Sequence, residues 1–242
     1  MIGLFSAPKR LLVVSVTKSF RHSSIAAGEA LIKDLADRSG GRYAAEYART
    51  EDELRQKLSA DGLKAWDTVV FCNTTGELPL PDPLAFVNWV RDGHGFVGVH
   101  SASDTFHNFK PYLEMLGGEF KTHGAQVPAA CLVADNRFPG LEKAGAVIAI
   151  PREEIYLFNN FTGDKVRLLL YLEKHPNAGT PGLYPLAWAR QWGRGRVFYT
   201  ALGHREDVWS APWFRDHLRG GIEWALGLAK ADVKPRPLPQ IP

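Results

Sequence analysis

The stretch GFVGVHSASD, at residues 95–104, decides the fold of this chain. Residues 95–100 form an apolar run without alternation, which is typical of a strand covered on both faces of a parallel sheet. The segment before it predicts a helix, because Asp82 can cap its start, Pro83 suits the first helical position and Gly93 ends it. A strand that follows a helix and ends in polar residues is one unit of an α/β sheet.

The alternation of strand and helix extends back from this stretch to residue 11. Strands are predicted at residues 11–16 (LLVVSV), 42–48 and 68–73 (TVVFCN). One helix is expected from Ser23, and Thr50 with Glu53 predicts a capping box that opens another, ending near Trp66. This order favours an open, mostly parallel sheet with right-handed crossovers.

The pattern changes beyond residue 118, where strand-like runs come with few helices between them. These runs are residues 129–133, 166–172, 186–192 and 196–202. Some must pair antiparallel, and the glycine-bearing loop at 193–195 predicts a hairpin. A last helix carries Phe214, Leu218 and Ile222 on one face. Residues 1–230 are expected to form a single α/β domain, and residues 231–242 a proline-rich tail that cannot continue the helix.

Composition and charge restrict the class of protein. The 242 residues are 45% hydrophobic, which is ample for a core, and a net charge of +3 predicts no nucleic-acid partner. The sequence lacks the ~18 consecutive apolar residues of a membrane span, and residues 1–10 do not resemble a secretory signal. Cys72 and Cys131 lie in apolar runs, as reduced core thiols do. We therefore expect a cytoplasmic protein, and the tail suggests a homodimer.

Polar residues follow four of the predicted strands. In open α/β sheets, ligands bind beyond the carboxyl ends of the strands, so these residues are the first candidates for a site. They are His22, Asn73, Thr74, the run from His100 through Ser101 to Asp104, and His204. Thr74 and Thr75 alone are more typical of a turn or cap. Three histidines at strand ends favour function, because sites are built on loops that a rigid scaffold holds.

The run GVHSA at residues 98–102 has the outline of a nucleophile elbow, in which a strand turns sharply into a helix. His100 stands at the tip of this turn. A histidine cannot replace a thiol or hydroxyl as the usual acyl-forming nucleophile, but it can act as a general base or bind a metal.

Seven segments resemble the successive signature blocks of the ThuA-like (trehalose utilisation) family. They are SVTKSFRHSSI, FCNTTGEL, GHGFVGVHSASD, LGGEFKTHG, EEIYLF, PLAWARQWGRGRVFYTALGH and GGIEWALG, which together span residues 13–227. The resemblance implies a fold similar to class I glutamine amidotransferases: a flavodoxin-like sheet with helices on both faces. It also implies that glutaminase activity is absent, because His100 occupies the position of the nucleophilic cysteine. Its functional implication is a role in the breakdown of disaccharides such as trehalose.

The resemblance assigns site residues one by one. The positions that match the family blocks are His22, Asn73, His100, Ser101, Asp104, His123, Glu154, Tyr156 and His204. Glu154 and Tyr156 are two apart in a strand-like run, so they should face the same way. Many relatives carry proline where this chain has Gly124, and glycine there is expected to loosen the loop that holds His123.

The first functional hypothesis is an enzyme that acts on a sugar or keto-sugar by acid-base chemistry. Its catalytic residues would be His100, Asp104, Glu154, His204 and Ser101, and its substrate-binding residues His22, Asn73, Thr74 and Tyr156. A divalent metal such as zinc could be held by His100, His123 and His204. No compact motif such as H-E-x-x-H supports the metal, so that prediction depends on convergence in space.

Two alternatives remain open from the sequence. One is a serine hydrolase built from Ser101, Asp104 and His204, although Asp104 is close to Ser101 for a triad partner. The other is a non-catalytic carbohydrate-binding or regulatory module, whose aromatic side chains would stack on sugar rings.

Overall fold

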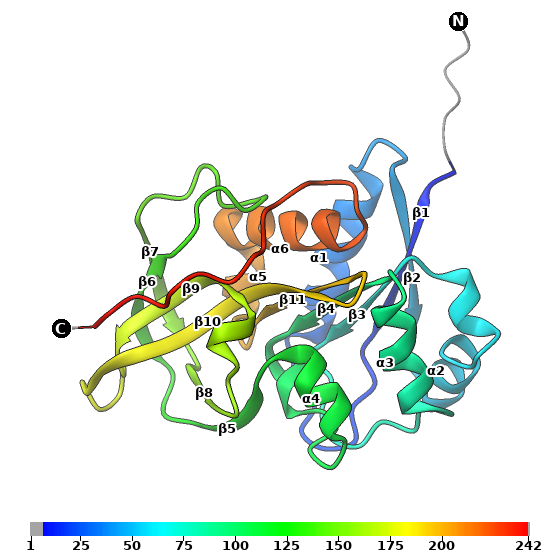
Figure 1. Cartoon of the computed structure of the whole chain (residues 1–242), viewed down its shortest axis with the longest axis horizontal. Coiled ribbons are helices and arrows are strands. Elements are labelled where there is room, and N and C mark those ends of the chain that lie inside the picture. Colours follow the sequence, from blue (N-terminus) through cyan, green and yellow to red (C-terminus); the bar gives the residue numbers. More distant parts are fainter. Residues whose placement is uncertain (1–6, 242) are drawn as a thin grey trace, which may run out of the picture.

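A nine-stranded sheet runs through the computed structural model, which describes residues 7–241 (Figure 1). The strands are β1 (Lys9–Val14), β2 (Tyr43–Ala48), β3 (Thr68–Cys72), β4 (Gly95–Val99), β5 (Glu119–His123), β6 (Val127–Val133), β7 (Val147–Glu153), β8 (Tyr156–Asn159), β9 (Arg167–Lys174), β10 (Pro181–Trp192) and β11 (Gly195–Thr200). The helices are α1 (Ile25–Asp37), α2 (Glu51–Lys57), α3 (Pro83–Arg91), α4 (Lys110–Leu116), α5 (Glu206–Ser210) and α6 (Pro212–Ala225). Three 3-10 turns are η1 (Gly62–Ala65), η2 (His100–Asp104) and η3 (Gly163–Lys165).

The strand order confirms the predicted fold. It is β2-β1-β3-β4-β11-β10-β9-β6-β7, and the first five strands are parallel. With β11 as the fifth strand, this is the flavodoxin-like order. The remaining four pair antiparallel, as expected for the C-terminal half, while β5 and β8 form a separate two-stranded sheet.

Helices cover both faces of the sheet and close two cores (Figure 1). Alternate residues of the central strands supply them: Leu11 packs towards α1 and α6, whereas Leu12 packs towards α3 and α4. Both leucines are fully buried, and burying such a side chain contributes about 2 kcal/mol. Cys72 and Cys131 are buried free thiols, as expected.

Local signals in the sequence set the ends of the elements. Thr50 and Glu53 form the predicted capping box, Asp82 caps α3, and Trp192 faces Gly195 across the predicted hairpin. The helix expected to reach Trp66 instead ends at Lys57. Its last carbonyls accept hydrogen bonds from side chains, since the Ser59 hydroxyl donates to Gln56 O and the Trp66 indole to Lys57 O. The last turn is therefore satisfied without further helix.

The proline-rich tail lies against its own chain. Arg167 is buried and donates to the carbonyl oxygens of Asp232 and Lys234, at 3.1 and 3.0 Å, while Val233 is buried in the core around α6. Among residues 7–241, no helix combines the length and the apolar composition needed to cross a bilayer. The expectation about a signal concerned residues 1–10, of which residues 1–6 lie outside the described part of the chain.

Candidate functional site

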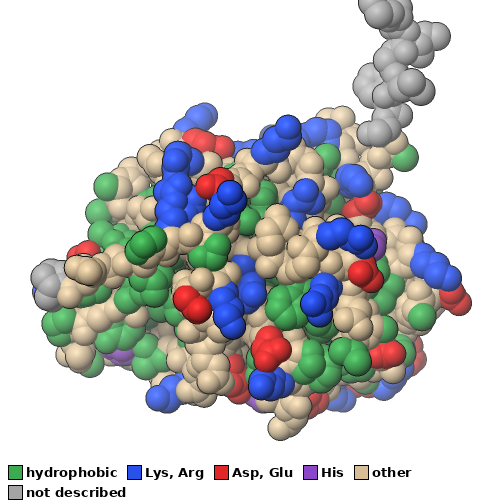
Figure 2. Space-filling model, in the orientation of Figure 1, with side chains coloured by type: hydrophobic (Ala, Val, Ile, Leu, Met, Phe, Trp, Pro, Cys, Tyr) green, Lys and Arg blue, Asp and Glu red, His purple; other side chains and the backbone are tan. Residues whose placement is uncertain are grey.

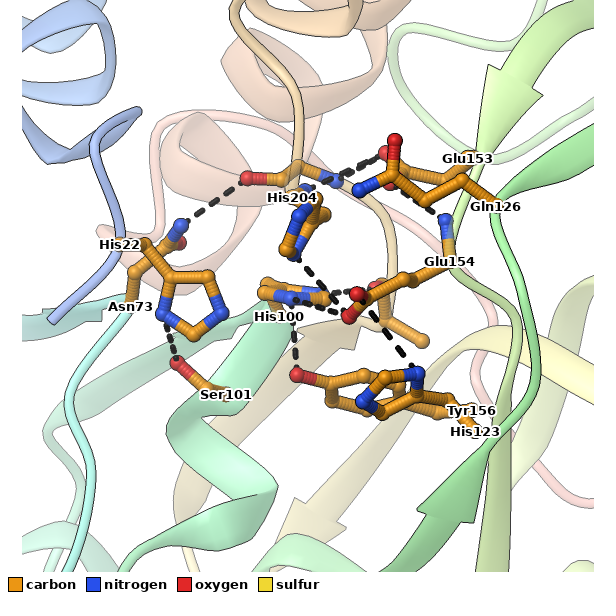
Figure 3. Close-up of polar contacts among 12 residues, drawn as sticks. His22, Asn73, His100, Ser101, His123, Gln126, Glu153, Glu154, Tyr156 and His204 are labelled. Carbon is orange, nitrogen blue, oxygen red and sulfur yellow. Dashed lines mark hydrogen bonds and ion pairs between the residues drawn. The ribbon is translucent and has the colours of Figure 1, made fainter. Parts of the chain in front are cut away.

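The carboxyl ends of the parallel strands meet at one polar cluster (Figure 3). His22 comes from the loop after β1, His100 follows β4 directly, and His204 lies in the turn after β11. Glu154 joins them from the junction between β7 and β8. We call these four residues the histidine cluster. One ligand atom from each lies within 4.8 Å of the others, so the ends of these strands bring the four side chains together.

His100 sits on a sharp turn, as the elbow pattern predicts. Its φ is +48°, a left-handed conformation that costs a non-glycine residue on the order of 1 kcal/mol or more. The surrounding structure holds it there, because the Tyr199 hydroxyl donates to His100 O at 2.7 Å and η2 begins at once. The side chain is fully buried, and its ring centroid lies 4.3 Å from that of Tyr156.

Hydrogen bonds fix the tautomer of His100. Its Nδ1–H donates to Ala201 O at 2.7 Å, because a carbonyl oxygen can only accept. The Nε2 lone pair therefore faces the cluster, where it accepts a hydrogen bond from the Tyr156 hydroxyl at 2.8 Å. Burial raises the pKa of Tyr156 well above its usual value, so the phenol keeps its proton.

The other two histidines surround His100. The ring centroid of His22 lies 4.7 Å from that of His100 and 5.1 Å from that of His204, in edge-to-face geometry. Nδ1 of His22 lies 3.4 Å from the Ser101 hydroxyl. Nδ1 of His204 lies 3.0 Å from Glu154 Oε2, which is itself 3.9 Å from His100 Nε2.

Burial and mutual repulsion keep two of these histidines neutral. Burial lowers the pKa of His22 to about 4, with a further contribution from nearby His204. Burial also lowers the pKa of His100 well below its usual value, and His22 adds to this shift. For His204, burial lowers the pKa, but the contact with Glu154 outweighs it and the net shift is upward.

Glu154 supplies the one carboxylate of the histidine cluster. Burial raises the pKa of Glu154, but the ionic contact with His204, 3.0 Å away, and the charge of His123 outweigh burial, so the net shift is downward. Glu154 is thus ionised at neutral pH and lies between His204, whose pKa it raises, and the neutral imidazole of His100. Such a set of nitrogen and oxygen donors matches the ligands that zinc and similar ions take in proteins.

Glu153 is a functional candidate that the sequence analysis did not identify. It ends β7, is fully buried, and accepts hydrogen bonds from the backbone N–H groups of Glu154, Gly203 and His204 at 2.8, 3.0 and 3.2 Å. Burial raises its pKa to about 7, although these hydrogen bonds lower it. Glu153 therefore holds the two segments that carry Glu154 and His204 in register.

Residues 10–225 match the family described as trehalose utilisation. The chain belongs to this family. No curated protein matches its sequence. Among solved structures, a ThuA-like protein from Bacteroides uniformis is 20% identical over 91% of this chain and 92% of its own, with a TM-score of 0.73. A ThuA-like protein from Parabacteroides merdae is 18% identical over 90% of each chain, with a TM-score of 0.74. A cytoplasmic protein from Salmonella typhimurium is 11% identical over 90% of this chain and 98% of its own, with a TM-score of 0.57. At these identities the likeness shows the fold alone.

Two residues predicted to bind substrate in this member of the trehalose utilisation family make hydrogen bonds inside the fold. Asn73 is fully buried, and its Nδ2 donates to Gly203 O at 2.9 Å and to Ser24 Oγ at 3.1 Å. Thr74 is also buried, and its hydroxyl pairs with that of Thr105 at 2.9 Å. Both face inward because the chain turns into the fold after β3, where Asn73 has a φ of +51°.

The serine hydrolase arrangement does not form. The Ser101 hydroxyl lies against His22, not His204, and the Asp104 carboxylate accepts from His107 Nε2 at 2.7 Å. Asp104 was predicted to be catalytic, but η2 directs it towards β5, where Nδ1 of the same His107 lies 2.8 Å from Glu119. We call His107, Asp104 and Glu119 the His107 tie.

His123 lies at the rim of the histidine cluster and not among its four members. Its Nδ1 is 3.6 Å from Glu154 Oε1, and 40% of its side chain is exposed. At Gly124 the Asn177 amide packs where a Cβ would stand, so a larger residue there would have to displace it. Nδ2 of Asn177 donates to Ala125 O at 2.9 Å and holds this segment. Tyr156 and Glu154 both face His100, as predicted.

Proposed function

We propose that this protein processes a sugar or an oxidised sugar by acid-base chemistry at the histidine cluster, with a zinc-type divalent metal bound there. The observation that carries the proposal is the convergence of three imidazoles and one carboxylate, whose ligand atoms lie within 4.8 Å of one another. The sugar as substrate class is supported by the family, which is described as trehalose utilisation.

The donor set fits a metal in three respects. His22 and His100 have lowered pKa values and are neutral. Glu154 has a lowered pKa and is ionised. The Nδ1–H group of His100 donates a hydrogen bond to the backbone carbonyl of Ala201. That last contact is the outer-shell arrangement common to metal-binding histidines. Because Nε2 of His100 has a single lone pair, Tyr156 must give up its hydrogen bond when a metal binds. A bound ion would polarise a substrate oxygen and acidify a bound water.

The residues around the cluster would position and protonate the substrate. The Tyr156 hydroxyl, once released from His100, is a neutral donor for a substrate oxygen. His123 is half-exposed beside Glu154 and can exchange a proton with a substrate held above the cluster. Phe20 is 63% exposed, its ring 4.8 Å from that of His22, and offers a face on which a sugar ring can stack.

Metal analysis of protein purified without a histidine tag tests the proposal. We expect about one divalent ion per chain, lost in His204→Ala but kept in His175→Ala, which changes a histidine outside the cluster. His204 is a better position than His100, because His100 is fully buried and its replacement also perturbs the fold. An ion content that is the same in both variants, or absent from the unmodified protein, would contradict metal binding at the cluster.

A second candidate function is sugar binding without turnover. It is favoured by Phe20, because an exposed aromatic ring beside a buried polar cluster is what a carbohydrate-binding surface requires. Calorimetric titration with a panel of disaccharides and their keto forms distinguishes the two. Binding without any product, with or without added zinc, would favour this alternative.

Assembly and location are further proposals. We propose a homodimer and a cytoplasmic location; one structural neighbour is named as a cytoplasmic protein. Asp232 and Lys234 at the start of the tail bind Arg167 of their own chain, so the proposed dimer would have to form through another surface. Light scattering at micromolar concentration tests the oligomeric state directly.

A further inference from the structure

A cavity of about 450 Å³ lies away from the histidine cluster, on the face of the sheet that α4 covers. Its walls come from α4, β10 and the segments around η3. The residues that matter to its chemistry are Lys110, Leu113, Glu119, Lys165, Arg190 and Trp192. Its volume is within the range of small-molecule pockets, which is about 300–1,000 Å³.

Arg190 lies in this cavity without a carboxylate partner. It is only 8% exposed, and among residues 7–241 no carboxylate oxygen lies within 4 Å of its guanidinium nitrogens. Nη1 donates to Glu114 O at 2.9 Å, but Nε has no hydrogen-bond partner in the described chain. Its Cζ lies 5.2 Å from the ring centroid of Trp192. Burial lowers the pKa of Arg190, which is the mark of a charge removed from water without full compensation.

The other charges around the cavity leave a positive balance for a ligand. Glu114 pairs with Lys110 at 3.6 Å, and Glu119 is engaged by His107 at 2.8 Å. Lys165, like Arg190, has no carboxylate within 4 Å in the part of the chain that the structure describes. Figure 2 shows blue and red side chains gathered over α4 and β10, on the face that carries this cavity. The two carboxylates that line the cavity are thus paired, whereas Arg190 and Lys165 are in no ion pair. Asp164, on the exposed turn next to Lys165, offsets part of their charge.

We propose that this cavity is a second binding site, for a small organic anion whose carboxylate or phosphate group binds Arg190 and Lys165. A guanidinium offers two parallel N–H groups to either anion, and its burial strengthens the hydrogen bonds. Trp192 and Leu113 supply an apolar wall for the body of the ligand. The site is separate from the histidine cluster and does not depend on the function proposed for it.

Calorimetric titration of the whole protein tests the site with four probes. They are inorganic phosphate, glucose 6-phosphate, glucuronate and, as the neutral comparison, glucose. We expect one or more of the anions to bind, more weakly as salt is raised, and glucose to bind much less tightly. Preference for glucose 6-phosphate or for glucuronate identifies the ligand group as phosphate or carboxylate. Failure of all three anions to bind, or equal binding of glucose by a protein that carries His22→Gln and His204→Gln, would overturn the proposal.

Variants locate the binding. Arg190→Gln should weaken the affinity for the anion by on the order of 30-fold or more, because it removes charge-assisted hydrogen bonds at a buried position. Lys165 is exposed, so Lys165→Gln should fold normally and weaken binding by about 3- to 10-fold. Lys143→Gln, a change at another exposed lysine, is the matched control. The double variant His22→Gln, His204→Gln should bind the anion unchanged. Unchanged affinity in Lys165→Gln, or loss in the histidine variant, would place the anion elsewhere.

Discussion

Two groups of histidine and carboxylate side chains lie close together in this fold and use the same residue types in opposite ways. In the histidine cluster, three imidazoles share Glu154 and are largely removed from water. In the His107 tie, one imidazole lies between two carboxylates, 2.7 Å from Asp104 and 2.8 Å from Glu119. Imidazoles thus outnumber carboxylates in the histidine cluster, whereas carboxylates outnumber the imidazole in the His107 tie.

The pKa directions follow from that ratio. Burial lowers the pKa of both His22 and His100, and no second carboxylate opposes it. Burial also lowers the pKa of His107, but hydrogen bonds to Glu119 and Asp104 outweigh it and the net shift is upward. Neutral imidazoles can bind a metal or take up a proton, whereas His107 has both ring nitrogens paired with carboxylates and has none free for a metal. The direction of the histidine pKa shifts therefore distinguishes the candidate site from the His107 tie, which contains the same residue types.

The largest expected effect comes from removing the one carboxylate of the histidine cluster. Glu154→Gln should weaken metal binding at least about 100-fold, because it replaces a charged ligand with a neutral one. The same change should lower the pKa of His204, since contact with Glu154 is what raises it. Metal titration and histidine NMR measure both. Glu119→Gln, which alters the His107 tie, is the control and should leave the metal affinity unchanged.

Acid should destabilise the protein through His22. Its folded pKa is about 4 and its unfolded pKa about 6.5, so the unfolded chain binds more protons between these values. The neutral ring therefore contributes stability above pH 6.5 that is lost as the pH falls towards 4, on the order of 3 kcal/mol. Urea unfolding at pH 7 and pH 4.5, with a chelator present, should show a smaller difference for His22→Gln. An equal difference in both proteins would show that His22 titrates normally.

Asn73 should matter to stability more than to ligand contact. Asn73→Gly keeps the left-handed backbone but removes the hydrogen bonds to Gly203 O and Ser24 Oγ, which should cost about 2 kcal/mol in unfolding free energy. Chemical denaturation measures this loss. If the variant is as stable as the unmodified chain but binds sugar poorly, Asn73 is a ligand residue after all.

The smallest effect is expected at the His107 tie. His107 is 36% exposed, so solvent screens its ion pairs and His107→Gln should cost less than about 1 kcal/mol. Because its folded pKa is raised, its contribution is complete below pH 6.5 and is lost as the pH rises through the folded value. Stability measured at pH 6 and pH 9 should converge for the two proteins at the higher pH. A gap that widens at pH 9 would contradict the pairing.

The parallel half of the fold was predictable because its strands are buried on both faces. Residues 68–72 and 95–99 are continuous apolar runs, and each is followed by a polar residue at the site. The later strands gave weaker signals: β5 has no buried position, β7 mixes exposed and buried positions, and both contain charged residues. His22, His100 and His204 could therefore be selected as candidates because each follows a predicted strand, although the strand order was not known.

The sequence does not determine the direction in which a side chain at a strand end points. Asp104 is only four residues from His100, yet the turn of η2 sends its carboxylate to His107. Asn73 follows a strand just as His100 does, but its amide braces the interior. Glu153 was missed because it stands next to Glu154 in a charged run, and only the fold shows that one is buried against backbone while the other faces the histidines.

The position of β11 has a consequence for how the chain reaches its active form. Thr200 of β11 pairs with Val99 of β4, so neighbouring strands in the sheet are about a hundred residues apart in the chain. Contacts of such long sequence separation form slowly, because much chain entropy is lost before they are made. During synthesis, His22 and His100 emerge from the ribosome well before His204, and β5 to β10 lie between them and β11 in the chain. A ribosome-bound chain stopped before residue 195 would therefore expose the edge of β4, and that edge is where misfolding of this protein is expected to begin.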